Sequence, residues 1–228
     1  MNVKTKIKMR VSDLGELNPM PDIKNVSYIH AGFEAKPSLS EEEKRYLGKG
    51  MVSTMLPYLL QDEYSRDKKE RDVNAVVLEN ENLKATFLPD YGARLWSLFD
   101  KKQNKELLYV NSVIQPCNLG LRNAWLSGGV EFNLGIKGHT PLTCDKMFCD
   151  FIGNYKVRFY EYERIRGVAY GITAYLPQGA EALYIKVQVE NTKDEPVYMY
   201  WWTNIAVPET KNTRVIVPAT DSIHCLYQ

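Results

Sequence analysis

The stretch from residue 115 to residue 150 gathers most of the residue types that can do chemistry. Only five of the 35 residues from Gln115 to Cys149 are charged, whereas charged residues make up 25% of the whole chain. The stretch also contains several glycines, one tryptophan, one histidine and three of the four cysteines. Low charge, glycines and single copies of catalytic residue types indicate a lined cavity rather than a solvated loop.

Apolar residues occupy every second position from Val130 to Ile136, which predicts a strand that buries one face in a core. The intervening residues share the other face: Glu131, Asn133, Gly135 and Lys137. Neighbouring side chains on one face of a strand lie about 7 Å apart, so a carboxylate, an amide and an ammonium share this face. The glycines around the strand allow a ligand to approach the backbone closely.

A neutral polyol requires this set of residue types. Its hydroxyl groups need fixed polar partners, and an aromatic ring covers its C–H surface. His139 follows the strand, and a hairpin-like return would bring the preceding segment alongside it. We therefore expect a saccharide cleft built around residues 118–140. The candidate substrate-binding residues are Arg94, Arg122, Asn123, Trp125, Asn133 and Lys137.

Glu131 and His139 are the candidate catalytic residues, because a carboxylate near a histidine or lysine can supply a general acid and a general base. We expect both side chains to open into one concave pocket. The enzymatic interpretation is a glycoside hydrolase or a sugar epimerase. Hydrolysis needs a second carboxyl group, about 5 Å away in retaining enzymes and about 6.5–9.5 Å away in inverting enzymes. Possible second members are Asp145, Glu161, Glu163 and Glu209.

Two further interpretations stay open for this strand. Glu131 and Lys137 are ordinary surface charges if the polar face meets solvent, because surface strands alternate in the same way. Alternatively, the domain is a structural or interaction module with a vestigial site. Arg94 stands close to Trp96, which is more typical of a structural hydrogen-bonding or stacking residue than of a catalyst.

Two other clusters of functional residue types have simpler explanations. Trp201 and Trp202 are adjacent, so they face opposite sides of a strand, and we expect at least one of them to pack in the core. The acidic and basic residues between positions 161 and 166 are sufficiently explained as solvated charges on two strand faces: Glu161, Glu163, Arg164 and Arg166.

Composition excludes several classes of protein. The 228 residues carry a net charge of about +1 with acids and bases interspersed, so nucleic acid and anionic membrane are not expected partners. No apolar run approaches the roughly 18 residues that span a bilayer. The basic start lacks a following apolar segment, and with the initial methionine this favours a cytoplasmic location. The cysteines show no CxxC spacing, so we expect reduced thiols, no metal and no cofactor.

The chain divides into residues 1–70 and residues 71–228. The first part predicts a short strand within residues 4–11, a turn-rich passage, and a helix capped by Ser40 and Glu43 that ends at Gly48. A solvated connector is expected at residues 61–72. The second part predicts an antiparallel all-β domain. Its expected strands lie at residues 73–79, 82–88, 94–99, 106–110, 155–164, 167–176, 183–190, 197–207 and 213–217.

Several long motifs carry a resemblance to a known family. They are LENENLKATFLPDYGARLWSLFDKK, LRNAWLSGGVEFNLGIKGHTP, YEYERIRG, MYWWTNIAVPE and TRVIVPA. With them, residues 76–220 resemble the DUF5107 family of bacterial domains, within the galactose-mutarotase-like superfamily. The resemblance implies a β-supersandwich and carbohydrate binding. Many similar proteins continue into tetratricopeptide repeats, so it also implies a C-terminally incomplete sandwich that associates with such repeats or with itself.

The mutarotase mechanism does not carry over residue by residue. The family's N-x-L-H-G-G motif is loosely matched around Asn123, with Ser127 in the place of its histidine. The N-H-x-Y-F-N motif is similar to the segment from Tyr200 to Asn204, with Tyr200 in the place of the histidine. The family's catalytic glutamate would lie beyond Gln228. The resemblance therefore leaves His139 with Glu131 as a substitute pair.

Overall fold

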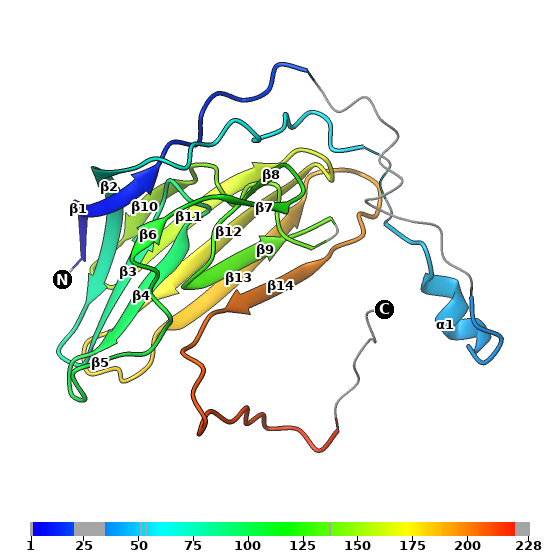
Figure 1. The fold of residues 1–228 in the computed structure, drawn as a ribbon. Coiled ribbons are helices and arrows are strands. Elements are labelled where there is room, and N and C mark those ends of the chain that lie inside the picture. Colours follow the sequence, from blue (N-terminus) through cyan, green and yellow to red (C-terminus); the bar gives the residue numbers. More distant parts are fainter. Residues whose placement is uncertain (1, 21–34, 51, 53, 137, 222–228) are drawn as a thin grey trace.

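A computed structural model describes residues 2–20, 35–50, 52, 54–136 and 138–221 (Figure 1). Within these residues the protein is nearly all β, with one short helix, which confirms the expected fold class. The strands form an eight-stranded sheet, a four-stranded sheet and a two-stranded sheet.

The eight-stranded sheet has the order β14-β9-β4-β3-β2-β1-β6, with β5 paired to β4. All its pairings are antiparallel except the one between β1 and β6. Its members are β1 (Asn2–Ser12), β2 (Lys68–Glu79), β3 (Leu83–Leu88), β4 (Arg94–Asp100), β5 (Lys105–Glu106), β6 (Val113–Ile114), β9 (Val130–Leu134) and β14 (Trp201–Ile205).

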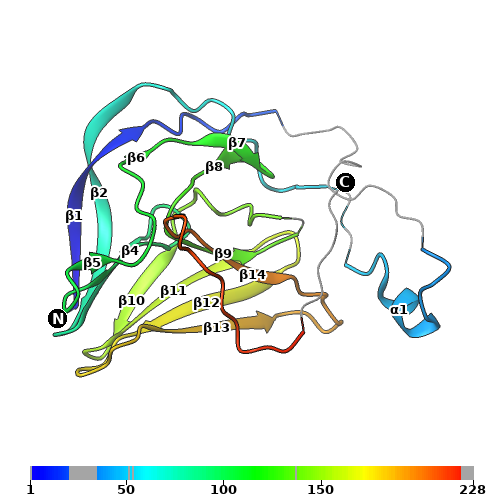
Figure 2. The same cartoon turned by 60° about the horizontal axis from the view of Figure 1, so that its bottom comes forward.

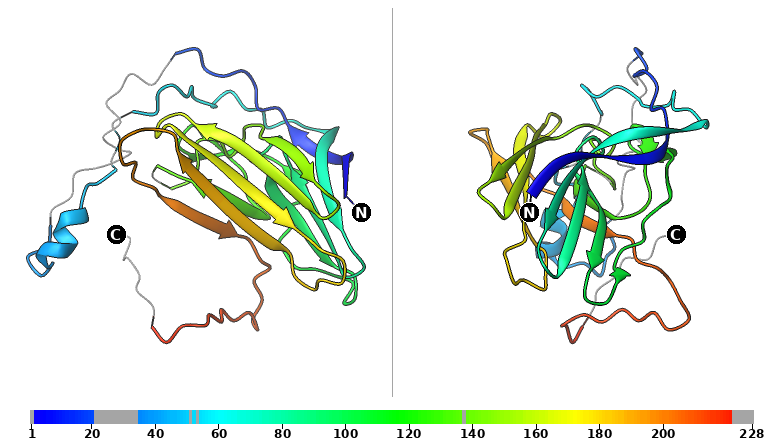
Figure 3. Two further views of the ribbon diagram at one scale, coloured as in Figure 1. Left: turned by 180° about the vertical axis from the view of Figure 1, so that it is seen from behind. Right: turned by 90° about the vertical axis from the view of Figure 1, so that its left-hand side faces the viewer.

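The four-stranded sheet is a simple antiparallel meander in chain order. It contains β10 (Phe148–Ile152), β11 (Lys156–Glu163), β12 (Val168–Tyr175) and β13 (Tyr184–Asn191). This sheet packs face to face against the eight-stranded sheet and lies in front in the left view of Figure 3. The main core fills the space between the two sheets, where Phe87 of β3 meets Phe159 of β11 at a ring-centroid distance of 5.1 Å.

A second apolar core lies on the other face of the eight-stranded sheet. It includes Val73 of β2, Leu88 of β3 and Trp96 of β4, all buried. The two-stranded sheet covers this face with β7 (Cys117–Gly120) and β8 (Asn123–Trp125), as Figure 2 shows. The central strands are therefore buried on both faces, which explains the continuous apolar run from Ala75 to Leu78.

The N-terminal residues contribute more to the sheet than expected. Strand β1 is eleven residues long and pairs with β2 from Asn2 to Ser12, so it is not short. Strand β2 begins at Lys68 and crosses residue 70, so the prediction of a solvated connector is wrong for residues 68–72. Gln61, in the same expected connector, is buried. Backbone pairing does not require apolar side chains, and the exposed charged residues of β1 and β2 hid these strands.

The helix α1 (Glu41–Tyr46) has the predicted start. Glu43 N donates to Ser40 Oγ at 3.2 Å, and Ser40 N donates to Glu43 Oε2 at 2.7 Å, which confirms the capping box. The helix is capped at its C-terminus by Leu47, and Gly48 follows with a φ of +70°. None of the helices in the described part of the chain has the length and apolarity to cross a membrane.

Two expected strands are wrong. Residues 106–110 form no strand beyond Glu106, and residues 213–217 lie outside any strand. A strand requires a partner for its backbone, and apolar β-forming side chains alone do not provide one. The expectation of one buried face at residues 183–190 is met only in part. Val187 and Val189 are half-buried, but Ile185 is exposed because β13 is the edge of its sheet.

Candidate functional site

Strand β9 is held in place by a pair of glycines that precede it. Gly128 and Gly129 both have positive φ angles, of +99° and +65°. A Cβ atom on Gly129 would lie 2.3 Å from the carbonyl oxygen of Leu95, so no other residue fits there. The turn places β9 between β14 and β4, with Val130 opposite both Ile205 and Leu95.

The two faces of β9 divide as predicted. Val130, Phe132 and Leu134 all lie in the main core. Ile136 is also buried, but it belongs to a small separate cluster with Met55, because the strand has ended at Leu134. Glu131 and Asn133 share the opposite face.

That opposite face is buried and does not meet solvent. Glu131 is 3% exposed and Asn133 is 0% exposed, so the interpretation of Glu131 as a surface charge is wrong. Lys137, the expected ammonium of this face, lies outside the described residues.

The carboxylate of Glu131 is surrounded by donors from four segments of the chain. His139 Nδ1 lies 2.8 Å from Oε2, and Thr143 Oγ1 donates to Oε1 at 2.6 Å. Trp125 Nε1 lies 3.2 Å from both oxygens, and Arg94 Nη2 lies 3.3 Å from Oε1. These donors use most of the acceptor capacity of the carboxylate.

This environment fixes the charge of Glu131. Burial by itself raises its pKa, but the His139 hydrogen bond, the Arg94 charge and the Thr143 hydroxyl outweigh that effect. Together they lower the pKa to about 2. Glu131 is therefore ionised at neutral pH, and His139 donates its Nδ1 proton to it.

His139 lies between two tryptophan rings. Its ring centroid is 5.0 Å from that of Trp125 and 5.1 Å from that of Trp202. Trp202 Nε1 donates to the carbonyl oxygen of Gly138 at 3.0 Å, which fixes the second ring. The His139 side chain remains 16% exposed, and among the described residues its Nε2 atom has no hydrogen-bond partner. The structure thus brings the two candidate catalytic residues together, with His139 on the outer side.

Trp202 and Thr143 are the site residues that sequence reasoning left out of the candidate set. Trp202 lies directly opposite Asn133 in the pairing of β14 with β9, which puts its ring on the site face. Trp201 faces the main core, as expected for one member of the pair. The adjacent tryptophans were a usable signal for Trp202. No local pattern singled out Thr143.

The remaining candidates serve mainly as internal connections. Buried Arg122 donates to the carbonyl oxygens of Leu59 at 2.7 Å and Pro141 at 3.0 Å, and it lies 2.5 Å from Asp145 Oδ2. It therefore ties the N-terminal segment to the loop after β9. Asn123 has a φ of +77° and stands in the tight turn between β7 and β8.

Arg94 and Asn133 each have one buried nitrogen without a partner among the described residues. Arg94 donates to Gly128 O at 3.1 Å and to Thr143 Oγ1 at 3.0 Å, which fits the structural role expected for it, but its Nε is unpaired. The side-chain oxygen of Asn133 accepts from the backbone N of Thr140 at 2.8 Å, and its Nδ2 is unpaired. Unpaired buried donors are uncommon and attract a ligand or water.

The suggested second carboxylates lie in separate places. Asp145 is engaged by Arg122 and by Gln61 Nε2 at 2.9 Å. Glu161 and Glu163 belong to β11 of the other sheet, and Glu209 is exposed beyond β14. No group of three His, Cys, Asp or Glu side chains suited to a metal ion occurs within the described residues.

Glu163 and Arg166 are not solvated charges, which corrects that expectation. Glu163 is fully buried and accepts from the backbone N atoms of Ile165 at 2.9 Å and Arg166 at 2.7 Å. Arg166 is 8% exposed and donates to Gly135 O at 3.2 Å and to Tyr198 O. The turn after β11 needs these partners for its backbone, and alternation along the strand could not reveal them.

The comparisons with known proteins now bear on this geometry. Residues 51–225 match the family model described as domain of unknown function (DUF5107). The chain belongs to this family, as its motifs predicted.

A solved structure has a similar fold. It is a TPR-domain containing protein from Parabacteroides distasonis ATCC 8503, with a TM-score of 0.69 and 22% sequence identity. The match covers 91% of this chain and 32% of that chain, so the chain spans about a third of the length of that protein. At this identity the match shows a shared fold.

Proposed function

We propose that this protein is a carbohydrate-binding β-sandwich domain of the mutarotase-like type. The observation that carries the proposal is His139, which Glu131 holds in one orientation between the rings of Trp125 and Trp202. A fixed polar atom between two aromatic faces suits a sugar ring, which presents hydroxyl groups at its edge and C–H groups on its faces. Asn133 Nδ2 is a spare buried donor on the same face of β9.

The geometry favours binding over glycoside hydrolysis. Glu131 is buried, is held by four side chains and has a pKa of about 2, so it is not suited to be a general acid. Its position supports a role in orienting His139. Any acid–base chemistry, such as sugar epimerisation, would then use His139 Nε2. This enzymatic alternative keeps Glu131 as a positioning residue.

NMR spectroscopy with a panel of monosaccharides, including galactose, glucose and xylose, tests both possibilities. Binding should shift the indole N–H signals of Trp125 and Trp202, and anomer exchange would appear as faster interconversion of the α and β signals. Because the aromatic ring and the fixed histidine carry the contact, Trp125→Ala and His139→Ala should each weaken binding about tenfold or more.

The matched control is Gln103→Ala, at an exposed position in the hairpin between β4 and β5. This variant should bind like the parent protein. If no saccharide of the panel shifts the tryptophan signals, or if His139→Ala and Trp125→Ala bind normally, the proposed site is wrong.

A second candidate function is an interaction module, and one observation favours it. Three consecutive apolar residues after β14 are strongly exposed: Val215 at 90%, Ile216 at 87% and Val217 at 59%. Strand β14 is also the last strand of its sheet within the described residues. An exposed apolar segment beside a free edge is suited to strand pairing with another chain. A second copy of this protein or a tetratricopeptide-repeat region are the proposed partners.

Size-exclusion chromatography with light scattering tests self-association. Ile216→Lys should reduce the dimer fraction because a charge opposes apolar pairing. Leu119→Lys, at a residue 57% exposed on β7, is the matched control and should leave the mass unchanged. A monomer at all concentrations for the parent protein would exclude self-pairing. Co-elution with a separately expressed tetratricopeptide-repeat segment tests the other partner.

A further inference from the structure

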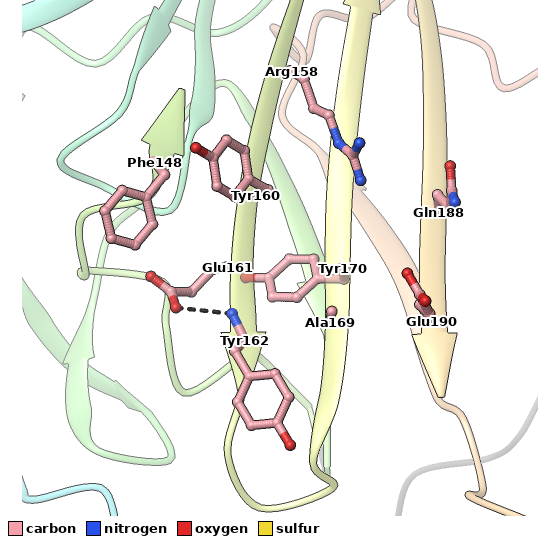
Figure 4. Close-up of a pocket in the computed structure, with 9 residues that line it drawn as sticks. All are labelled: Phe148, Arg158, Tyr160, Glu161, Tyr162, Ala169, Tyr170, Gln188 and Glu190. Atoms are coloured by element: carbon pink, nitrogen blue, oxygen red, sulfur yellow. Dashed lines mark hydrogen bonds between the residues drawn. The ribbon is translucent and has the colours of Figure 1, made fainter. Parts of the chain in front are cut away.

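A groove of about 270 Å³ lies on the outer face of the four-stranded sheet, away from the Glu131–His139 site (Figure 4). Strands β10 and β11 provide one wall with Phe148 and Tyr160. Strand β13 provides the other wall with Gln188 and Glu190, and Ala169 of β12 lies between the two walls. The groove therefore runs across strands that belong to a rigid meander.

The aromatic wall follows from the pairing of the strands. Phe148 lies directly opposite Tyr160, and their rings stack at a centroid distance of 5.6 Å with an interplanar angle of 20°. Tyr162 is two residues further along β11 and shares the same face. These rings are 60%, 37% and 40% exposed for Phe148, Tyr160 and Tyr162. A contiguous exposed aromatic surface marks an interaction site.

The floor of the groove is low because β12 has its smallest residues there. Gly171 pairs with Tyr160, and Ala169 pairs with Tyr162. A Cβ atom on Gly171 would come within 2.9 Å of Arg158 Nε, so the Arg158 side chain passes close over this glycine. Large residues at these two positions would fill the space between the walls.

Polar side chains with free hydrogen-bonding capacity surround the aromatic wall. Arg158, Gln188 and Glu190 have no hydrogen bond or ion pair with any other described residue. They provide a guanidinium, an amide and a carboxylate on three strands whose backbones are fixed by the sheet. The single positive and single negative charge balance, which disfavours a polyanion such as nucleic acid.

We propose that this groove is a second saccharide-binding surface that takes a neutral oligosaccharide. The stacked rings of Phe148 and Tyr160 provide the platform for a sugar face, and Arg158, Gln188 and Glu190 bind its hydroxyl groups. Tyr175 and Tyr184 extend the aromatic surface toward the far end of the sheet, with ring centroids 6.1 Å apart. The exposed face thus suits a chain of sugar units. The proposal does not rest on the Glu131–His139 site, because the two sites lie on different sheets.

Isothermal titration calorimetry with cellohexaose, maltohexaose and mannohexaose tests the proposal on the full chain. At least one hexasaccharide should bind, and Tyr160→Ala should weaken that binding about tenfold. Ala169→Leu should have a similar effect, because it fills the floor and leaves the rings in place. Both positions face solvent, and circular dichroism verifies that the variants fold.

Two control variants separate this groove from the first site. Tyr155→Ala removes an exposed tyrosine in the turn before β11 and should bind like the parent protein. His139→Ala should lose monosaccharide binding but keep hexasaccharide binding. If His139→Ala abolishes hexasaccharide binding while Tyr160→Ala does not, the groove proposal is wrong and the first site stands.

Two other results would also overturn the groove proposal. One is that none of the three hexasaccharides binds. The other is concentration-dependent dimerisation that Tyr160→Ala abolishes, because the groove would then be occupied by a second copy of the chain. Neither result bears on the Glu131–His139 site.

Discussion

Strands β9 and β13 have closely similar sequence patterns and lie in opposite environments. In β9, Glu131 and Asn133 alternate with apolar residues, and in β13, Gln188 and Glu190 do the same. All residues of β9 are buried, whereas no residue of β13 is buried. The same alternation therefore produced an enclosed polar site in one sheet and a solvent-facing strand in the other.

The difference comes from what covers each strand. Strand β9 has β14 and β4 as neighbours, and the rings of Trp125 and Trp202 with the loop around Thr143 cover its polar face. Strand β13 lies at the edge of its sheet, and none of the described residues forms a layer over its outer face. Period two assigns a side chain to a face, and the covering layer decides whether that face is buried.

The largest expected effect is the removal of charge from Glu131. Glu131→Gln leaves Arg94 buried opposite a neutral group, and we expect the free energy of unfolding to fall by about 3–5 kcal/mol. Glu190→Gln is the matched change on β13 and should alter stability by less than about 0.5 kcal/mol. Urea unfolding of both variants measures the difference. Equal effects would show that burial does not distinguish the two glutamates.

The stability of the parent protein should depend on pH through the same group. The pKa of Glu131 is about 2 in the folded protein and near its ordinary value of 4.5 when unfolded. Its contribution is therefore complete above about pH 4.5 and is lost as the pH falls toward 2. The difference corresponds to about 3 kcal/mol.

Urea unfolding at pH 5.5 and pH 2.5 measures this contribution. Glu131→Gln should show a smaller loss of stability between these pH values than the parent protein, and Glu190→Gln should keep the full loss. A parallel pH dependence for Glu131→Gln and the parent protein would contradict the low pKa.

A smaller effect is expected for the two amides. Asn133→Ala leaves the buried N–H of Thr140 without its acceptor and should cost about 1–2 kcal/mol. Gln188→Ala removes an exposed amide without a described partner and should be nearly neutral. Thermal unfolding of the two variants provides the measurement. A destabilising Gln188→Ala would mean that β13 is covered in solution.

Much of the local structure could be predicted from the sequence because it depends on neighbouring residues. The capping box of Ser40 and Glu43 was one such feature, and the division of β9 between Phe132 in the core and Glu131 on the other face was another. Both depend on backbone geometry that repeats over a few residues. The long motifs likewise identified the family.

Only the tertiary structure decided which residues surround Glu131. Arg94 comes from β4, Thr143 from the loop after β9, and Trp202 from β14, which is far along the chain. The same holds for β1, whose charged residues concealed its pairing with β2, and for Val215–Val217, which has β-forming residues and no partner. Alternation along a strand is a property of the local backbone. Burial and hydrogen bonding depend on segments that only folding brings together.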